Sequence, residues 1–92
     1  MILEILSPES LLFNGEVNSV FLPGVDGSFQ ILNNHAPFVS LLQTGIVKFS
    51  GNNINIKEDK ANKFTKNQDF FSIEINSGTI EVNENKIIVL VD

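Results

Sequence analysis

The sequence predicts an all-β fold, an antiparallel β-sandwich of about ten short strands in two sheets. Short apolar runs and alternating apolar and polar residues recur along the chain, and Gly, Asn, Asp and Pro interrupt them. The interruptions come about every 8 to 12 residues, a spacing typical of sandwiches and barrels. Helical periodicity is nearly absent. Because 92 residues can bury only one core, we expect a single domain over residues 1–92.

Three strands are predicted in the first third of the chain. The predicted strands are Ile2–Leu6, Glu16–Pro23 and Gly27–Leu32, and turn-forming residues separate them. The Asp-Gly pair before the third strand predicts a hairpin turn, because these residues tolerate a positive φ. Phe29 and Ile31 then fall on one face of that strand, since side chains alternate along it.

Six more strands are predicted in the rest of the chain, and they are Phe38–Leu42, Gly45–Ser50, Asn53–Ile56, Asp69–Ile75, Thr79–Val82 and Lys86–Val91. Short turns separate several of them, with Gly-Asn, Ser-Gly and Asn-Glu-Asn sequences that favour tight reversals. The total is nine or ten strands. Between the third and fourth of these six lies Lys57–Gln68, a segment of mixed charge that we interpret as a solvated loop or an edge hairpin.

Charge and composition exclude several classes of partner. The chain has no cysteine, so neither a disulfide framework nor a thiolate metal site supports the fold. Its net charge of −5 repels phosphate backbones and anionic lipids, which argues against binding to nucleic acid or directly to a bilayer. No apolar run is long enough to span a membrane, and the N-terminus lacks the basic leader of a secretion signal. We expect a protein partner, and membrane association only through another subunit.

His35 is the only histidine, and its surroundings do not favour chemistry. A general base would need an orienting carboxylate and a nucleophile or water, but the local sequence Asn-Asn-His-Ala-Pro offers amides and apolar groups. A transition-metal site would normally require a second histidine or a cysteine. We therefore expect no catalytic, metal-binding or cofactor-binding residues.

Two other patterns are interpreted as structural. Gly24 and Gly27 are spaced like part of a phosphate-binding loop, but no Gly-Lys-Ser/Thr and no helix follow them. Several acidic residues alternate with apolar neighbours, as on the solvent face of strands, and these are Glu4, Glu9, Glu16, Glu81 and Glu84.

The loop from Asn33 to Pro37 has a fixed shape. Pro37 fixes its own φ and keeps Ala36 out of the helical region, while the asparagine side chains can bond to nearby backbone groups. A preorganised loop lowers the ordering cost of association. The residues by themselves thus predict a binding or structural module.

Two other functions remain as alternatives. One is a free-standing sandwich that binds a ligand such as a sugar, although Trp and Tyr, whose rings stack on such ligands, are absent, and the eight Phe fall mainly at core positions. The other is a small hydrolase centred on His35.

Five motifs in order resemble the N-terminal β-sandwich of the epsilon subunit of F-type ATP synthases. They cover almost the whole chain, and they are Leu12–Val17, Leu22–Leu32, Asn34–Pro37, Leu41–Phe49 and Ser77–Asp92. The resemblance implies two packed antiparallel sheets and no catalysis in this subunit. It also implies a place in the central stalk, between the gamma subunit and the c-ring, on the cytoplasmic side of a bacterial inner membrane.

The resemblance also assigns contact residues. Carried over by position, Ser28, Phe29 and Gln30 fall where the family meets the c-ring. The gamma-facing positions are Ser7, His35 and Ser40. Our hypothesis for the mechanism is that the sandwich acts as a stiff clamp between ring and stalk, with the contact area supplied by apolar residues on an outward sheet face and with His35 and Pro37 at its rim.

The sequence departs from the family pattern at several of these positions. Ser28 stands where many relatives have an acidic residue opposite a basic c-ring loop, and Gln30 replaces a common glycine. Asn33 and Asn34 replace a proline and a glycine or asparagine, and Lys57–Gln68 is longer than in many relatives.

Full-length relatives continue beyond the position of Asp92 into a two-helix hairpin, which carries inhibition and nucleotide sensing in the family. For a chain that ends at Asp92, the resemblance implies coupling of rotation without inhibition and without ATP binding.

Overall fold

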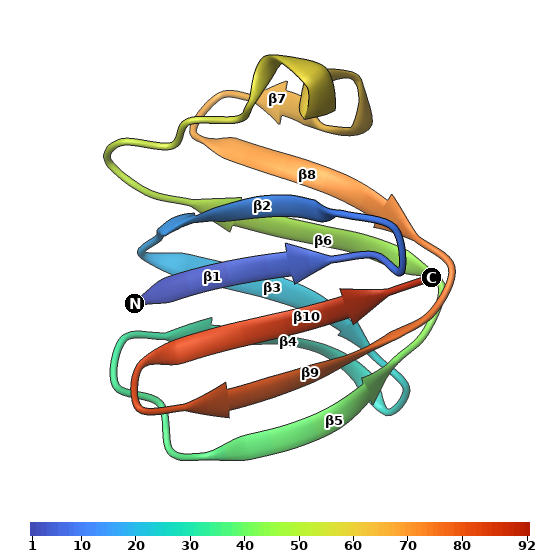
Figure 1. Ribbon diagram of the computed structural model, residues 1–92. Helices are drawn as coiled ribbons and strands as arrows, with labels where there is room; N and C mark the ends of the chain where they lie inside the picture. The colour runs from blue at the N-terminus through green and yellow to red at the C-terminus, as the bar shows by residue number, and fades with distance from the viewer.

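The predicted alternation of apolar and polar residues produces ten strands and one short 3-10 helix in the computed structural model, which describes residues 1–92 (Figure 1). The elements are β1 (Ile2–Leu6), β2 (Leu11–Glu16), β3 (Ser19–Gly24), β4 (Gly27–Leu32), β5 (Phe38–Leu42), β6 (Gly45–Ser50), η1 (Glu58–Lys63), β7 (Thr65–Asn67), β8 (Phe70–Ile75), β9 (Gly78–Asn83) and β10 (Lys86–Val91).

The strands form two layers that are joined along one edge. The first sheet has the order β2-β1-β10-β9-β5, and the second has the order β4-β3-β6-β8-β7. Between β5 and β3 the pairing is reduced to Gly24 and Leu42, and the Gln43 N–H donates to the Pro23 carbonyl at 2.9 Å. One continuous sheet therefore curls over itself, which confirms the predicted β-sandwich. All pairs are antiparallel except β1 with β10, which lie far apart in the sequence and so need no hairpin.

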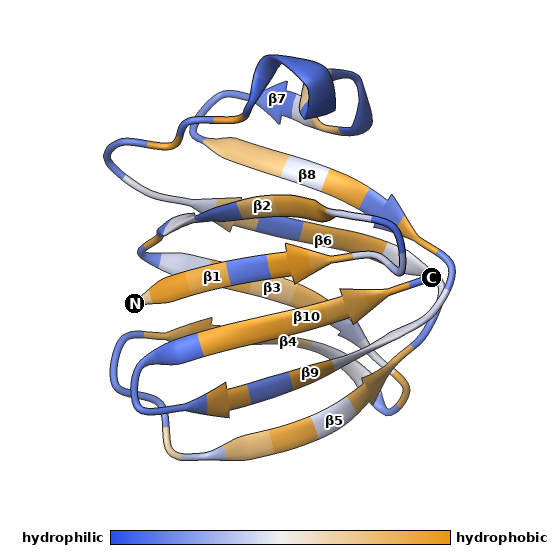
Figure 2. Cartoon of the chain, viewed as in Figure 1, coloured by the Kyte–Doolittle hydropathy of each residue, from blue (hydrophilic) through white to orange (hydrophobic).

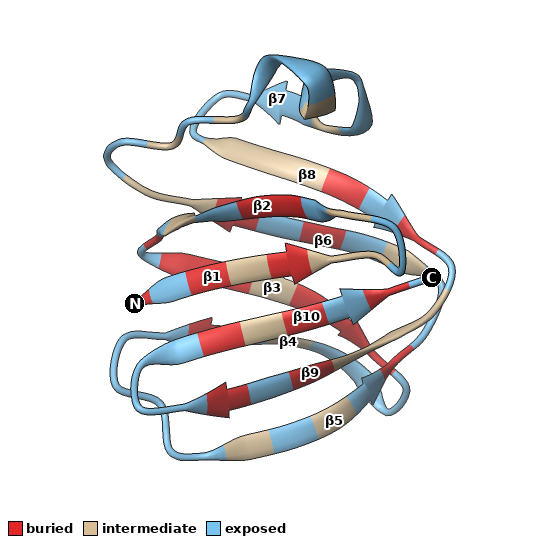
Figure 3. Ribbon diagram, viewed as in Figure 1, coloured by how far each residue is buried: buried red, intermediate tan, exposed pale blue.

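The core lies between the two layers. Nineteen buried apolar residues form a single cluster, and Figure 3 shows buried and more exposed positions alternating along β1 and β10. Phe13 of β2 and Phe49 of β6 face each other across the interior, with ring centroids 4.7 Å apart. Burying each large apolar side chain contributes about 1.5–3 kcal/mol. The two sheets are thus held together mainly by apolar packing.

The predicted strand Glu16–Pro23 is wrong as a single element, and β2 was missed. The chain crosses from the first sheet to the second at Val17 and Asn18. The Val17 N–H donates to the Met1 carbonyl at 2.9 Å, whereas the Asn18 N–H donates to the Ser50 carbonyl in β6 at 2.7 Å. Val17 is buried, so apolar and polar residues continue to alternate through this crossover. The sequence pattern therefore did not reveal the change of sheet.

Asn53–Ile56 is also not a strand. Its alternation arises because Ile54 and Ile56 pack against the core from an irregular connection. The following segment contains η1, which has no buried residue, and β7, which pairs with β8 at the edge of the second sheet. The edge-hairpin interpretation of Lys57–Gln68 is therefore confirmed, with a helical turn added. The other predicted strands agree with the structure to within one residue at each end.

Candidate docking face

The outer face of the first sheet carries most of the exposed large apolar side chains. Of eight such residues, five lie on strands of this sheet, and they are Ile2, Leu11, Val39, Leu41 and Leu90. Figure 2 shows that β10 is hydrophobic along almost its whole length, rather than alternating. A strand that is apolar on both faces normally has both faces covered. The inner face of β10 covers the core, so its outer face is a candidate docking surface.

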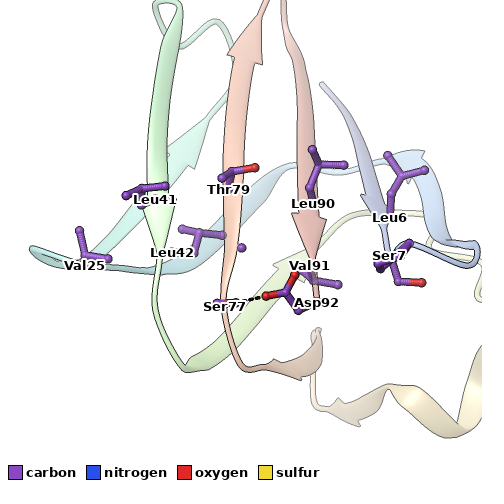
Figure 4. A pocket seen from close by; sticks show the side chains of 12 residues that line it. Leu6, Ser7, Val25, Leu41, Leu42, Ser77, Thr79, Leu90, Val91 and Asp92 are labelled. Atoms are coloured by element: carbon purple, nitrogen blue, oxygen red, sulfur yellow. Dashed lines mark hydrogen bonds between the residues drawn. The ribbon is translucent and has the colours of Figure 1, made fainter.

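Strand register arranges part of this face into a row across all five strands. Residues that lie directly opposite one another in neighbouring strands form the series Leu41, Thr79, Leu90, Leu6 and Leu11. We call this series the leucine row. Figure 4 shows the first four of these side chains side by side on β5, β9, β10 and β1. At a strand spacing of about 4.8 Å, the row is about 19 Å long.

A groove of about 610 Å³ opens beside the leucine row. Leu6, Leu41 and Leu90 line it, together with Val25 from the turn between β3 and β4 (Figure 4). Leu41 is 61% exposed and Leu90 is 51% exposed. Where the groove meets the chain terminus, the Ser77 hydroxyl donates to the Asp92 carboxylate. The groove is therefore largely apolar with a polar end.

The three predicted gamma-contact residues do not come together. Ser7 follows β1, lines the groove, and its N–H donates to the Ser10 carbonyl at 2.9 Å. Ser40 lies on β5 next to Leu41 but on the opposite face, since Val39 and Leu41 are the outward residues. His35 lies in the loop between β4 and β5, at the other end of the strands from Ser7 (Figure 1).

His35 is exposed and packs against an aromatic pair. Its Nδ1 lies 2.7 Å from the Ala36 carbonyl oxygen, and its ring centroid lies 5.7 Å from that of Phe38. Phe38 in turn contacts Phe29 edge-on, with the centroids 5.4 Å apart. The imidazole thus contributes to a packed aromatic cluster on the surface. No group of three or more His, Cys, Asp and Glu side chains is placed to hold a metal ion.

Two asparagines attach the His35 loop to other parts of the chain. The Met1 amino group donates to Asn33 Oδ1 at 2.8 Å, and the Asn34 N–H donates to Asn85 Oδ1 at 2.8 Å. Asn34 has a φ of 63°, in the left-handed region that asparagine tolerates. The Asn33 side chain thus bonds to the N-terminus rather than to nearby backbone, and Asn34 bonds through its backbone N–H to a side chain in the turn between β9 and β10.

The predicted c-ring residues lie on β4, at the edge of the second sheet. Ser28 and Gln30 are exposed, while Phe29 is half-buried and packs against the core. On the neighbouring strand β3, Pro23 lies opposite Ser28 and Phe21 lies opposite Gln30. The three residues therefore divide between two faces, and only the two polar ones are available on the outer face.

The leucine row is not among the contact residues that the sequence predicted. The available signal was the apolar run Ile87–Val91, in which Ile88 and Leu90 occupy positions that alternation would make polar. These residues form a row only because five strands pair in a particular register. That register depends on pairings between segments that are distant in the sequence.

The whole chain matches the family model described as "ATP synthase, Delta/Epsilon chain, beta-sandwich domain", over residues 1–92. It is 40% identical over 90 residues to the ATP synthase epsilon chain of Sulfurimonas denitrificans, covering 98% of this chain and 58% of that protein. It is also 40% identical over 90 residues to the epsilon chain of Chlorobium limicola, covering 98% of this chain and 86% of the relative.

Two solved structures share the fold. One contains the central stalk and c-ring of the Tetrahymena thermophila mitochondrial ATP synthase, with a TM-score of 0.74 and 16% identity over 99% of this chain and 62% of that chain. The other is the Euglena gracilis mitochondrial ATP synthase, with a TM-score of 0.76 and 16% identity over 99% of this chain and 49% of that chain. The structure contains no helix with the length and hydrophobicity of a membrane span. The chain belongs to the delta/epsilon family of ATP synthase β-sandwich domains.

Proposed function

We propose that this chain is a non-catalytic subunit of the central stalk of a proton-translocating F-type ATP synthase. As a single domain over residues 1–92, it joins the gamma subunit to the c-ring and turns with them during ATP synthesis. Family membership and the relatives named as ATP synthase epsilon chains support this assignment. The subunit is peripheral to the membrane, on the cytoplasmic side of a bacterial inner membrane, and uses no cofactor of its own.

The apolar outer face of the first sheet is the observation that carries the proposal. Apolar groups exposed to water contribute about 25 cal/mol per Å² when a partner covers them. A stable interface buries about 1,600 Å² in total, and the leucine row with its groove provides the apolar centre of such an area. The gamma subunit covers this face, and Ser7 lies at the edge of the contact, because it lines the same groove.

The c-ring contact uses another part of the molecule. Ser28 and Gln30 point outward from β4 in the second sheet, so the ring and the gamma subunit are bound by different layers of the sandwich. Phe29, Phe38 and His35 form a packed series between β4 and the loop that precedes β5. Torque passes between the partners through the core and the sheet hydrogen bonds, which resist shear.

Copurification tests the proposed place in the complex. Source membranes are solubilised gently, the rotary complex is isolated, and its subunits are identified by peptide mass mapping. We expect peptides of this sequence together with the alpha, beta and gamma subunits.

A functional test follows from removing the chain. Membranes depleted of it are expected to lose proton-coupled ATP synthesis, and adding the purified chain back is expected to restore it. Full synthesis in depleted membranes would show that the chain does not couple ring and stalk.

A further inference from the structure

A second row of outward residues runs beside the leucine row. It consists of Val39, Glu81, Ile88, Glu4 and Asn14. It lies two residues away from the leucine row on four strands, about 7 Å, and three residues away on β2, where the register shifts. We call this series the acidic row. The outer face of the first sheet therefore carries the apolar leucine row and, parallel to it, the acidic row with its two carboxylates.

The two carboxylates, those of Glu4 and Glu81, differ in whether a positively charged side chain pairs with them. Glu4 has Lys86 beside it, with Nζ 3.7 Å from Oε2, and this is the only ion pair within 4 Å in the structure. Glu81 is exposed and has no such partner. Its neighbours in the row are apolar, since Val39 and Ile88 lie directly opposite it on β5 and β10. Glu81 is thus an exposed carboxylate without an ion pair, between two apolar neighbours in its own row, and Lys86 and Glu84 line a pocket with it.

Docking on this face changes the environment of Glu81. A partner that covers Leu41 and Leu90 also removes water from the adjacent row. Binding is weakened if an ionised carboxylate loses water without gaining a counter-charge or hydrogen bonds. A basic side chain of the partner that pairs with the carboxylate at the edge of the interface instead favours association and fixes its orientation. A partner with a neutral or acidic flank would therefore bind this face poorly.

We propose that the polypeptide docked on the first sheet has an apolar ridge that fills the leucine row and basic side chains along the flank that faces Glu81 and Glu4. This inference rests on the proposed function, in which that polypeptide is the gamma subunit, and it adds the charge pattern and the orientation of the contact.

The outer face of the second sheet has a different chemistry, which provides the control. There Lys48 projects from β6, with its ammonium 5.2 Å from the Phe21 ring centroid and 4.9 Å from the Phe70 centroid. Glu74 of β8 is an exposed strand glutamate on this other face. It matches Glu81 in residue type, exposure and secondary structure, but it lies outside the proposed contact.

The test measures binding of fluorescently labelled chain, at several salt concentrations, to a stripped complex that contains the alpha, beta and gamma subunits but neither the c-ring nor the native chain. We expect Glu81→Lys to weaken binding about tenfold at low salt, with a smaller difference at high salt, because ions screen surface charges. Glu81→Gln is expected to weaken binding less and to flatten the salt dependence. Glu74→Lys is expected to bind like the unmodified chain.

The outcomes separate the two claims. If the unmodified chain does not bind the stripped complex, the proposed function fails. If it binds, but Glu81→Lys and Glu81→Gln bind equally well with the same salt dependence, the flank of the partner is not basic and the inference is overturned. Thermal unfolding of each variant confirms that it is folded. Glu81→Gln, which preserves size and shape, decides the question if Glu81→Lys does not fold.

Discussion

At the scale of single residues, Asn85, in the turn between β9 and β10, holds the distant loop between β4 and β5. It has a φ of 59°, and its side-chain oxygen accepts the Asn34 N–H at 2.8 Å. Asn85→Gly keeps the backbone conformation accessible and removes only this bond. We expect faster amide hydrogen exchange at Asn34 and a loss of no more than about 1 kcal/mol in the free energy of unfolding.

The neighbouring Glu84 offers a matched control for this prediction. It has a φ of 51° in the same turn, and its side chain makes no hydrogen bond to the loop. Glu84→Gly is therefore expected to leave exchange at Asn34 unchanged. Equal protection of Asn34 in the two variants would show that the side chain of Asn85 does not hold the loop.

At the scale of elements, Gly78 allows three strands to lie close together. It pairs with Val91 of β10 on one side and with Leu42 of β5 on the other. A Cβ at Gly78 would overlap the carbonyl oxygen of Leu90, which is backbone and cannot rotate away. We expect Gly78→Ala to lower the free energy of unfolding by about 1–3 kcal/mol, measured by urea denaturation. Thr79→Ala, one residue further on, is the control and should cost less; equal losses would contradict the steric explanation.

The elements also show which parts of the fold are local. The strands Phe38–Leu42 and Lys86–Val91 could be predicted to the residue, because alternation, apolar runs and flanking turns are encoded within each segment. The crossover at Val17 could not be predicted, since it depends on which strand accepts each N–H. The same holds for the docking face. Ser28 and Gln30 are outward on one strand as alternation requires, whereas the leucine row exists only after β1 has paired with β10.

At the scale of the whole molecule, the two layers present different surfaces. The first sheet exposes leucines beside carboxylates, and the second exposes Lys48 between aromatic rings. One core supports both surfaces, so a force applied to one layer is transmitted to the other through close-packed side chains. A small, close-packed sandwich suits the mechanical role that we propose for it.

The division between core and docking face leads to a prediction about stability and binding. Leu41→Thr and Leu90→Thr, made together, remove apolar surface that is already in water and keep a residue suited to strands. We expect little change in the urea midpoint. We expect binding to the stripped rotary complex to weaken at least tenfold, because apolar side chains at the centre of an interface contribute most of its energy. The control is Ile46→Thr on β6 of the second sheet, which is exposed to a similar degree, 54% against 51% for Leu90. Unchanged affinity in the leucine variant, or an equal loss with Ile46→Thr, would show that the first sheet is not the docking face.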